Sequence, residues 1–82
     1  MHALAAMTLD IVLLRSLLEV VDTGGFALAA QNLALTPSAV SGHIKRLEHS
    51  AGKQLLARTT RSLELTAAGE LLYMYARNIV DL

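Results

Sequence analysis

The residues between 38 and 49 carry the side chains with the clearest potential for chemistry. They are small, polar or cationic at five positions, namely Ser38, Ser41, Gly42, Lys45 and His49. Hydroxyl groups exchange hydrogen bonds with base edges and phosphates, and a lysine ammonium can bind guanine or a phosphate. A single serine is typical of any helix start, so the prediction of a nucleic-acid-binding surface depends on the whole set.

A helix from Pro37 to about Ala51 is predicted to position these side chains. Thr36 can cap it with its hydroxyl, and Pro37 suits the first helical position because its missing N–H would have no partner there. The apolar residues that predict its buried side are Val40, Ile44, Leu47 and Ala51. The polar residues named above then face outward, and the N–H groups of Ser38 and Ala39 are expected to be phosphate donors.

A shorter helix is predicted immediately before this one. Its apolar residues follow helical spacing over two turns: Phe26, Ala29, Ala30 and Leu33. The two alanines would let another helix approach closely, and Leu35 is expected to be buried in the tight connection. Two helices joined by so few residues cross at a steep angle, the helix-turn-helix arrangement that sets a helix into a DNA groove.

A first helix over residues 9–22 is predicted to support this pair. Thr8 is expected to cap it, with Asp10 in its first turn, where an acid suits the helix dipole. Its main apolar stripe is Leu14, Leu17, Leu18 and Val21, which Ile11, Val12 and Val20 extend round the side. One glycine of the Gly24-Gly25 pair is expected to end the helix in the left-handed conformation. Residues 1–8 are interpreted as a flexible leader.

After Gly52 the apolar spacing changes from that of a helix to that of strands. Residues 55–58 and 62–65 predict a small β-hairpin, or wing, with its tip at 59–61. Arg58 and Arg61 at this tip could bind phosphates or enter the minor groove. Exposed arginines on a hairpin are often only solvated, but their place in a cationic segment favours the binding interpretation.

Thr66 is predicted to begin a last helix, in which Gly69 permits close packing. The apolar side of this helix is formed by Leu71, Leu72, Tyr75, Ile79 and Leu82, with Met74 and Val80 beside it. The chain is 54% apolar, more than 82 residues can bury alone, so a partner subunit is expected. Because the periodic segment stops without a capping signal, the helix is expected to continue into a segment that this sequence does not include.

The charges are segregated although their sum is zero. Residues 38–61 hold five lysines and arginines against Glu48 alone, a net charge of +4, and both flanking segments are acidic. This distribution is typical of a nucleic-acid-binding surface. Five cations on one side can also be an ordinary solvated face.

Composition argues against several other classes of protein. The chain has no cysteine, which excludes disulfides and thiolate zinc sites, and His43 and His49 are spaced unsuitably for chelating one ion on a helix. No segment reaches the roughly 20 apolar residues that cross a membrane, and the N-terminus makes a poor signal peptide. A soluble, intracellular protein without a cofactor is therefore expected. No serine has a plausible His/Asp set and no glycine-rich phosphate loop is present, which argues against an enzyme.

One set of residues, taken with its spacing, is specific enough to indicate a family. The set consists of Ala29-Ala30, Leu33, Thr36, Ser38-Ala39-Val40-Ser41, Ile44-Lys45, Leu47-Glu48, Gly52, Leu55, Arg58, Leu65-Thr66 and Ala68-Gly69-Glu70. It closely resembles the N-terminal domain of LysR-type bacterial transcriptional regulators, over residues 9–82. The resemblance implies a mainly α-helical winged helix-turn-helix domain, with three helices and a wing over residues 9–65 and a linker helix over 66–82.

The resemblance also implies partners and sites. It implies a bacterial, cytoplasmic regulator that binds double-stranded DNA at interrupted palindromes, as a homodimer through the linker helix or as a dimer of dimers. A small-molecule effector would act through a further domain. The recognition positions of the family fall on Thr36, Pro37, Ser38, Ser41 and Gly42, and its wing cations fall on Arg58 and Arg61.

The sequence departs from the family pattern at several positions. Pro37 replaces a common glutamine and Gly42 a frequent arginine, so two base-reading side chains are missing. Leu56 stands in place of a phenylalanine, Lys53 in place of an apolar residue, and Gly25 in place of a capping serine, which costs only a few tenths of a kcal/mol. These departures and the zero net charge leave a rival interpretation, a protein-interaction or dimerisation module that has lost specific DNA binding.

Overall fold

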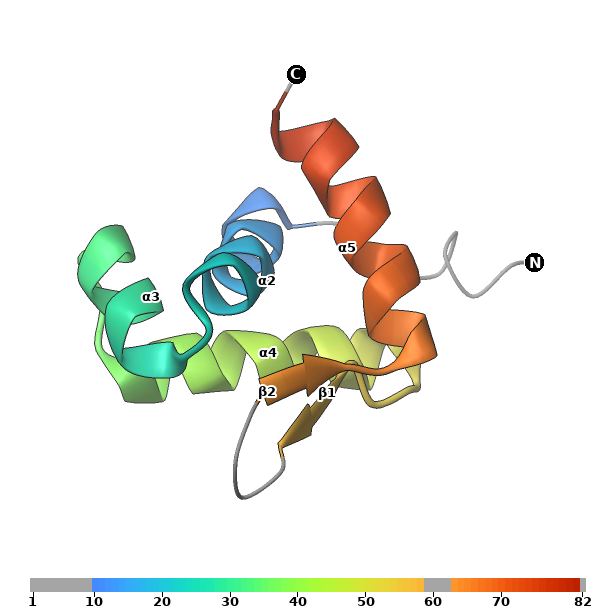
Figure 1. Ribbon diagram of the computed structural model, residues 1–82, viewed down its shortest axis with the longest axis horizontal. Coiled ribbons are helices and arrows are strands. Elements are labelled where there is room, and N and C mark those ends of the chain that lie inside the picture. The colour runs from blue at the N-terminus through green and yellow to red at the C-terminus, as the bar shows by residue number, and fades with distance from the viewer. Residues whose placement is uncertain (1–9, 59–62, 82) are drawn as a thin grey trace.

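The computed structural model describes residues 10–58 and 63–81. In chain order these form α2 (Ile11–Thr23), α3 (Phe26–Leu33), α4 (Pro37–Ala51), β1 (Leu56–Arg58), β2 (Leu63–Leu65) and α5 (Ala67–Val80). Figure 1 shows α3 and α5 on opposite sides of α2, with α4 and the hairpin along the lower edge. The predicted three helices, small hairpin and C-terminal helix are thus confirmed, and the predicted leader lies outside the described residues.

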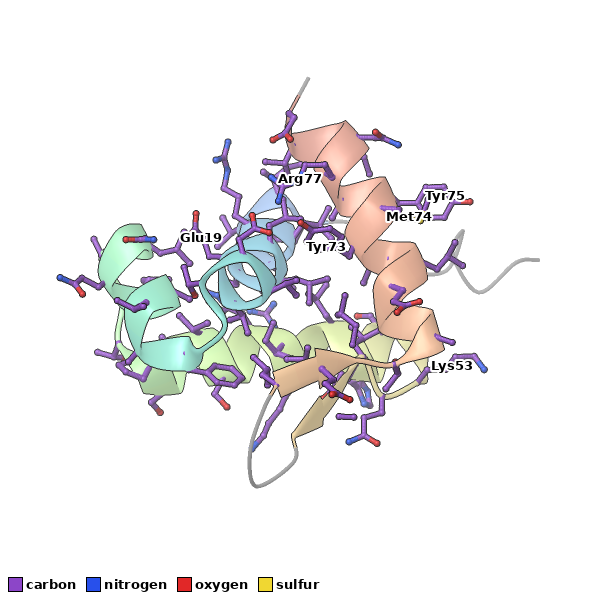
Figure 2. All side chains as sticks on the ribbon, in the orientation of Figure 1. Glu19, Lys53, Tyr73, Met74, Tyr75 and Arg77 are labelled. Carbon is purple, nitrogen blue, oxygen red and sulfur yellow. The ribbon has the colours of Figure 1, made fainter. Side chains whose placement is uncertain are left out.

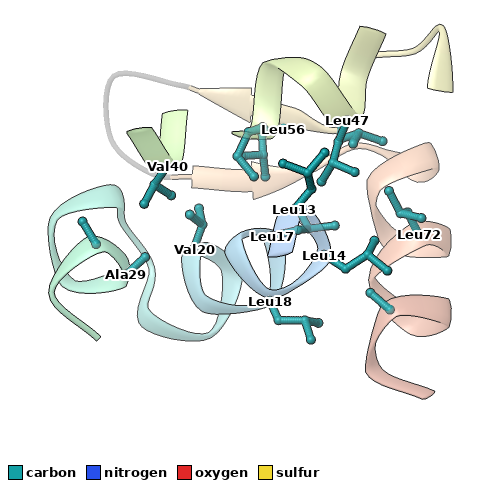
Figure 3. Close-up of a cluster of buried hydrophobic side chains, with 14 residues drawn as sticks. Leu13, Leu14, Leu17, Leu18, Val20, Ala29, Val40, Leu47, Leu56 and Leu72 are labelled. Carbon is teal, nitrogen blue, oxygen red and sulfur yellow. The ribbon is translucent and has the colours of Figure 1, made fainter. Parts of the chain in front are cut away.

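Helix α2 is the centre of the domain because it packs against α3, α4 and α5. Its buried residues are Leu13, Leu14, Ser16, Leu17, Leu18 and Val20. Figure 3 shows side chains of the other helices and of β1 meeting around it. The predicted wide apolar surface of α2 is confirmed, although Ile11 and Val12 at its start are exposed.

The start of α2 differs from the prediction. Asp10 is the N-cap rather than a residue of the first turn, and its carboxylate accepts a hydrogen bond from the Val12 N–H at 2.9 Å. Aspartate caps a helix at least as well as threonine, and its charge favours the positive end of the helix dipole. Thr8, the predicted cap, lies outside the described residues.

Backbone conformation, rather than a buried side chain, shapes the two turns around α3. Gly24 ends α2 at φ +82, and Gly25 caps α3 without any side-chain hydrogen bond. After α3, Ala34 takes φ +57 and the Leu35 N–H donates to the Ala30 carbonyl at 2.9 Å. Because these bonds close the turn, Leu35 is not needed to fill it. The predicted burial of Leu35 is wrong, since its side chain is 39% exposed.

Helix α4 has the predicted bounds and the predicted N-cap. The Thr36 hydroxyl accepts from the Ala39 N–H at 3.1 Å, and Gly52 ends the helix at φ +68. Val40, Ile44 and Leu47 are buried, and the predicted core position Ala51 is half-buried. The side of α4 that faces the core is therefore the side that the spacing predicts.

The hairpin is antiparallel, with Leu56 opposite Leu65 and Arg58 opposite Leu63. Strand β1 begins one residue later than predicted, and residue 62, the predicted start of the second strand, lies outside the described part. Leu55 precedes β1 as a buried residue, and residues 59–62, which include the tip, lie outside the described part. The Glu48 carboxylate accepts from the Leu55 and Leu56 N–H groups at 2.9 and 3.4 Å, so it ties the last turn of α4 to β1.

The N-terminal end of α5 is attached to the segment before β1 by backbone contacts. The Thr66 N–H donates to the Leu55 carbonyl at 3.0 Å, and its hydroxyl donates to the Gln54 carbonyl at 2.6 Å. That hydroxyl also caps α5 by accepting from the Gly69 N–H at 3.0 Å. A Cβ on Gly69 would lie 2.0 Å from the Leu55 carbonyl oxygen, so the predicted close packing at this glycine is confirmed.

Further along, polar side chains tie α5 to the end of α2. The Tyr73 hydroxyl donates to Asp22 at 2.6 Å, Arg77 forms an ion pair with the same carboxylate, and Arg77 donates to the Tyr73 oxygen at 2.9 Å. Desolvation opposes ionisation of Asp22, but these hydrogen bonds and the Arg77 charge outweigh it and hold the pKa of the carboxyl below its ordinary value. At a pH above the ordinary carboxyl pKa, the lowered pKa of Asp22 stabilises the fold. This contribution is lost as the pH falls through the lowered pKa.

We expect Gly69→Ala to destabilise the domain by about 2 kcal/mol. The new methyl would overlap the Leu55 carbonyl, and overpacking of this kind outweighs the better helix propensity of alanine. The matched control is Gly42→Ala, also in a helix, where a Cβ would meet no atom within 4 Å. It should stabilise by about 0.5–1 kcal/mol. Urea unfolding of both variants measures the difference, and equal effects would contradict the close approach at Gly69.

Candidate nucleic-acid interface

The outer side of α4 presents the residues that the sequence selects. Thr36, Pro37, Ser38 and Lys45 are exposed, and Ser41 and Gly42 are partly exposed. Ser38, Ser41, Gly42 and Lys45 lie on the side of α4 away from the buried Val40, Ile44 and Leu47. Thr36 and Pro37 are exposed at the adjoining N-terminal end of the helix, so the structure places the six predicted positions on this side and this end.

This surface allows close approach of another molecule to the helix backbone. Nothing lies within 4 Å of the position that a Cβ on Gly42 would occupy, and Pro37 is exposed at the helix start. Only one of the two predicted phosphate donors is consistent with the cap, because the Ala39 N–H already donates to Thr36. The Ser38 N–H keeps that role as a prediction.

A partly buried hydrogen bond behind this surface links α4 to α2. The Ser16 hydroxyl lies 2.7 Å from His43 Nδ1, and Ser16 is fully buried. Which of the two donates depends on the imidazole tautomer. Sequence reasoning missed this contact, although a serine inside the leucine-rich stretch LLRSLLEV was a signal that a polar partner would be needed.

Three cations of the cationic segment lie in the described part with exposed side chains, namely Lys45, Arg46 and Lys53. The one acid of that segment, Glu48, directs its carboxylate to backbone N–H groups. Arg58 ends β1, and Arg61 lies outside the described residues. The wing contacts of Arg58 and Arg61 stay a prediction.

The exposed side of α5 is apolar. Its large exposed side chains are Leu71, Met74, Tyr75 and Ile79, with Met74 63% exposed. Figure 2 shows Met74 and Tyr75 pointing away from α2, whereas Tyr73 and Arg77 point toward it. Leu72 was predicted on the same apolar side, but it is only 6% exposed because it packs with Ala76 into the domain's own core. Leu82 lies outside the described residues.

Other kinds of site find no support in the described part of the chain. Residues 10–58 and 63–81 contain no group of three His, Asp or Glu side chains placed to hold a metal ion. None of the helices within these ranges is long and apolar enough to span a membrane. The polar surface of α4 is thus the best-defined candidate site.

Comparison with known proteins identifies the family. Residues 11–70 match the family described as "Bacterial regulatory helix-turn-helix protein, lysR family". The chain is 44% identical over 63 residues to the probable HTH-type transcriptional regulator LtrA of Klebsiella pneumoniae, covering 77% of this chain and 20% of LtrA. It is also 44% identical over 73 residues to the regulator HdfR of Escherichia coli, covering 89% of this chain and 26% of HdfR.

A solved structure supports the same conclusion. The DNA-binding domain of BenM, in complex with catB site 1 DNA, superposes with a TM-score of 0.84 at 32% identity, over 89% of this chain and 82% of that one. The chain therefore belongs to the lysR family of bacterial regulatory helix-turn-helix proteins, which is a family of transcriptional regulators and not of enzymes. It spans 20% and 26% of the lengths of LtrA and HdfR.

We expect Ser16→Ala to destabilise the domain by about 1–2 kcal/mol, because it leaves His43 Nδ1 without its buried partner. Ser50→Ala is the matched control, since Ser50 lies exposed on α4, and its stability should stay close to that of the wild type. Thermal and urea unfolding measure both. A Ser16→Ala protein as stable as the control would mean that the hydrogen bond contributes nothing.

Proposed function

We propose that this chain is the DNA-binding domain of a transcriptional regulator and that it binds double-stranded DNA sequence-specifically, with α4 in the major groove. The observation that carries the proposal is the outer side of α4, where small, polar and cationic residues lie together on a helix whose opposite side is buried. The likeness to the BenM domain, whose structure contains DNA, supports it.

The proposed binding combines several weak contributions from α4. The positive end of the helix dipole lies at Pro37, and together with the Ser38 N–H it favours a phosphate there. Ser38 and Ser41 are short enough for the backbone to approach base edges, and Lys45 reaches a guanine or a phosphate. With Pro37 and Gly42 lacking long polar side chains, DNA shape would contribute to specificity.

The wing and α5 complete the proposal. We propose that Arg58 and Arg61 bind the DNA backbone or the minor groove beside α4. A second copy would cover the exposed side chains of Leu71, Tyr75 and Ile79, so that a homodimer reads an interrupted palindrome. Membership of the family leads to three further proposals for the whole protein. These are assembly into tetramers, a cytoplasmic location in bacteria, and a small-molecule effector bound by a domain beyond this chain.

The test of DNA binding is selection from a random pool of double-stranded DNA, followed by titration at several salt concentrations. Three variants should each make the negative slope of log K against log salt less steep by about 0.9, the effect of one lost phosphate contact. They are Lys45→Ala, Arg58→Ala and Arg61→Ala. Arg15→Ala, an exposed arginine of α2 outside the cationic segment, should leave the slope unchanged.

Different outcomes of this titration separate the parts of the proposal. Unchanged slopes for both wing arginines would refute the wing contacts while leaving α4 in place. A wild-type protein that selects no sequence would instead favour the rival, a protein-interaction module that has lost specific DNA binding.

Ser41→Ala should change which bases are preferred rather than how strongly salt weakens binding. If Ser41 contacts a base directly, its loss should alter discrimination at one or two positions of the selected site by about 1–3 kcal/mol. Ser50→Ala is the control, because nine positions further along the helix it lies on the opposite side of α4. Competition between single-base variants of the site provides the measurement, and identical preferences for wild type and Ser41→Ala would exclude direct readout by Ser41.

A further inference from the structure

We propose that Asp22, Tyr73 and Arg77, here called the α2–α5 clasp, set the angle at which α5 leaves the domain and thereby the half-site spacing that a dimer accepts on DNA. The inference rests on the proposed function, in which two copies pair through α5. In such a dimer the direction of α5 relative to α4 determines how far apart the two reading helices lie.

Two separate attachments define the direction of α5. The first is at its N-terminal end, where Thr66 hydrogen-bonds to the Gln54 and Leu55 carbonyls and Gly69 packs against Leu55. This attachment consists of two hydrogen bonds to backbone carbonyls, one from the Thr66 N–H and one from its hydroxyl, and a tight contact at Gly69, so it serves as a pivot. The second is the clasp, in which Arg77 lies eleven positions after Thr66, about 16 Å along a helix.

Between the pivot and the clasp, apolar packing alone does not specify an angle. Leu72 and Ala76 are the buried residues of that stretch, and apolar contacts are non-directional. The clasp is directional, because Tyr73 donates to Asp22 at 2.6 Å and Arg77 donates to the Tyr73 oxygen at 2.9 Å. The Arg77 guanidinium also lies 5.3 Å from the Tyr73 ring centre, which keeps the donors in place.

The clasp and the proposed pairing surface lie on opposite sides of α5. In Figure 2, Tyr73 and Arg77 reach toward α2, while Met74 and Tyr75 point away from it. A change in the clasp would therefore tilt the surface that a second copy covers, with no change at α4 itself. Since the side chains of Arg77 and Asp22 are 37% and 41% exposed, water and salt can weaken this contact.

The experiment uses the half-site that the wild-type protein selects from random DNA, placed twice in probes that differ only in the spacing between the copies. The wild type should prefer one spacing. Asp22→Asn and Arg77→Gln should reduce that preference about two- to fivefold, the range expected of an exposed ion pair, with unchanged affinity for a single half-site. Asp81→Asn is the matched control, because Asp81 is the C-cap of α5 and pairs with Arg77 of the same helix, whereas Asp22 joins Arg77 to α2.

Two further measurements protect the test against a variant that folds poorly. Tyr73→Phe keeps the ring and the ion pair while removing the hydroxyl, and it should weaken the preference less than Asp22→Asn does. In the unaltered protein, raised salt should flatten the ratio of affinities between spacings, because it screens the exposed ion pair.

The outcomes distinguish this inference from the proposed function. A wild type that selects no DNA sequence would overturn both. A wild type that selects a site but accepts all spacings equally would overturn the inference alone. Folded Asp22→Asn and Arg77→Gln proteins with the spacing profile of the wild type would overturn it as well, as would an Asp81→Asn protein that behaves like them.

Discussion

Burial of the leucines of α2 is the constraint on which the other elements depend. In so small a domain one helix supplies the packing surface for α3, α4 and α5 at once, and Leu14, Leu17 and Val20 are fully buried as a result. The small side chains Ala29, Ala30 and Ala76 appear where the neighbouring helices approach this helix or one another. Any shift of α2 would therefore move the outer side of α4 and the direction of α5 together.

Polar contacts fix the orientation of helices and strands that apolar packing only brings together. The Ser16–His43 hydrogen bond links α2 to α4, Glu48 links α4 to β1, and the α2–α5 clasp links the end of α2 to α5. Apolar burial is non-directional, whereas a hydrogen bond depends steeply on distance and angle. Each element that would contact DNA or a second copy is thus positioned by at least one such contact.

The domain keeps its two proposed contact surfaces chemically distinct. The outer side of α4 is small, polar and cationic, and it leaves the helix backbone accessible at Gly42. The outer side of α5 exposes large apolar groups such as Met74 and Tyr75, which a monomer leaves in water. Charge and polarity suit contact with a phosphate backbone, and apolar area suits pairing of subunits, so the two partners would not compete for one surface.

Much of this protein was determined by the sequence itself, because local signals act over one or two turns. The helix ends are specified by capping residues, namely Thr36 with Pro37, Thr66, Gly24 and Gly52. Helical spacing identifies Val40, Ile44 and Leu47 as the buried side of α4. Ser38, Ser41, Gly42 and Lys45 of the candidate site follow from that periodicity, and Thr36 and Pro37 follow from the helix start. The exposure of the Leu35 side chain was not predictable in this way, since backbone hydrogen bonds rather than a side chain close its turn.

Only the tertiary structure decided the contacts between residues far apart in the chain. Leu72 and Leu71 are neighbours in an apolar helix, yet one packs inside the domain and the other is exposed, because the position of α2 selects which of them is covered. Ser16 with His43 and Asp22 with Arg77 are 27 and 55 residues apart. Periodicity identifies which side of a helix is apolar, but the partner of each side chain depends on how the helices cross, and that is a property of the assembled core.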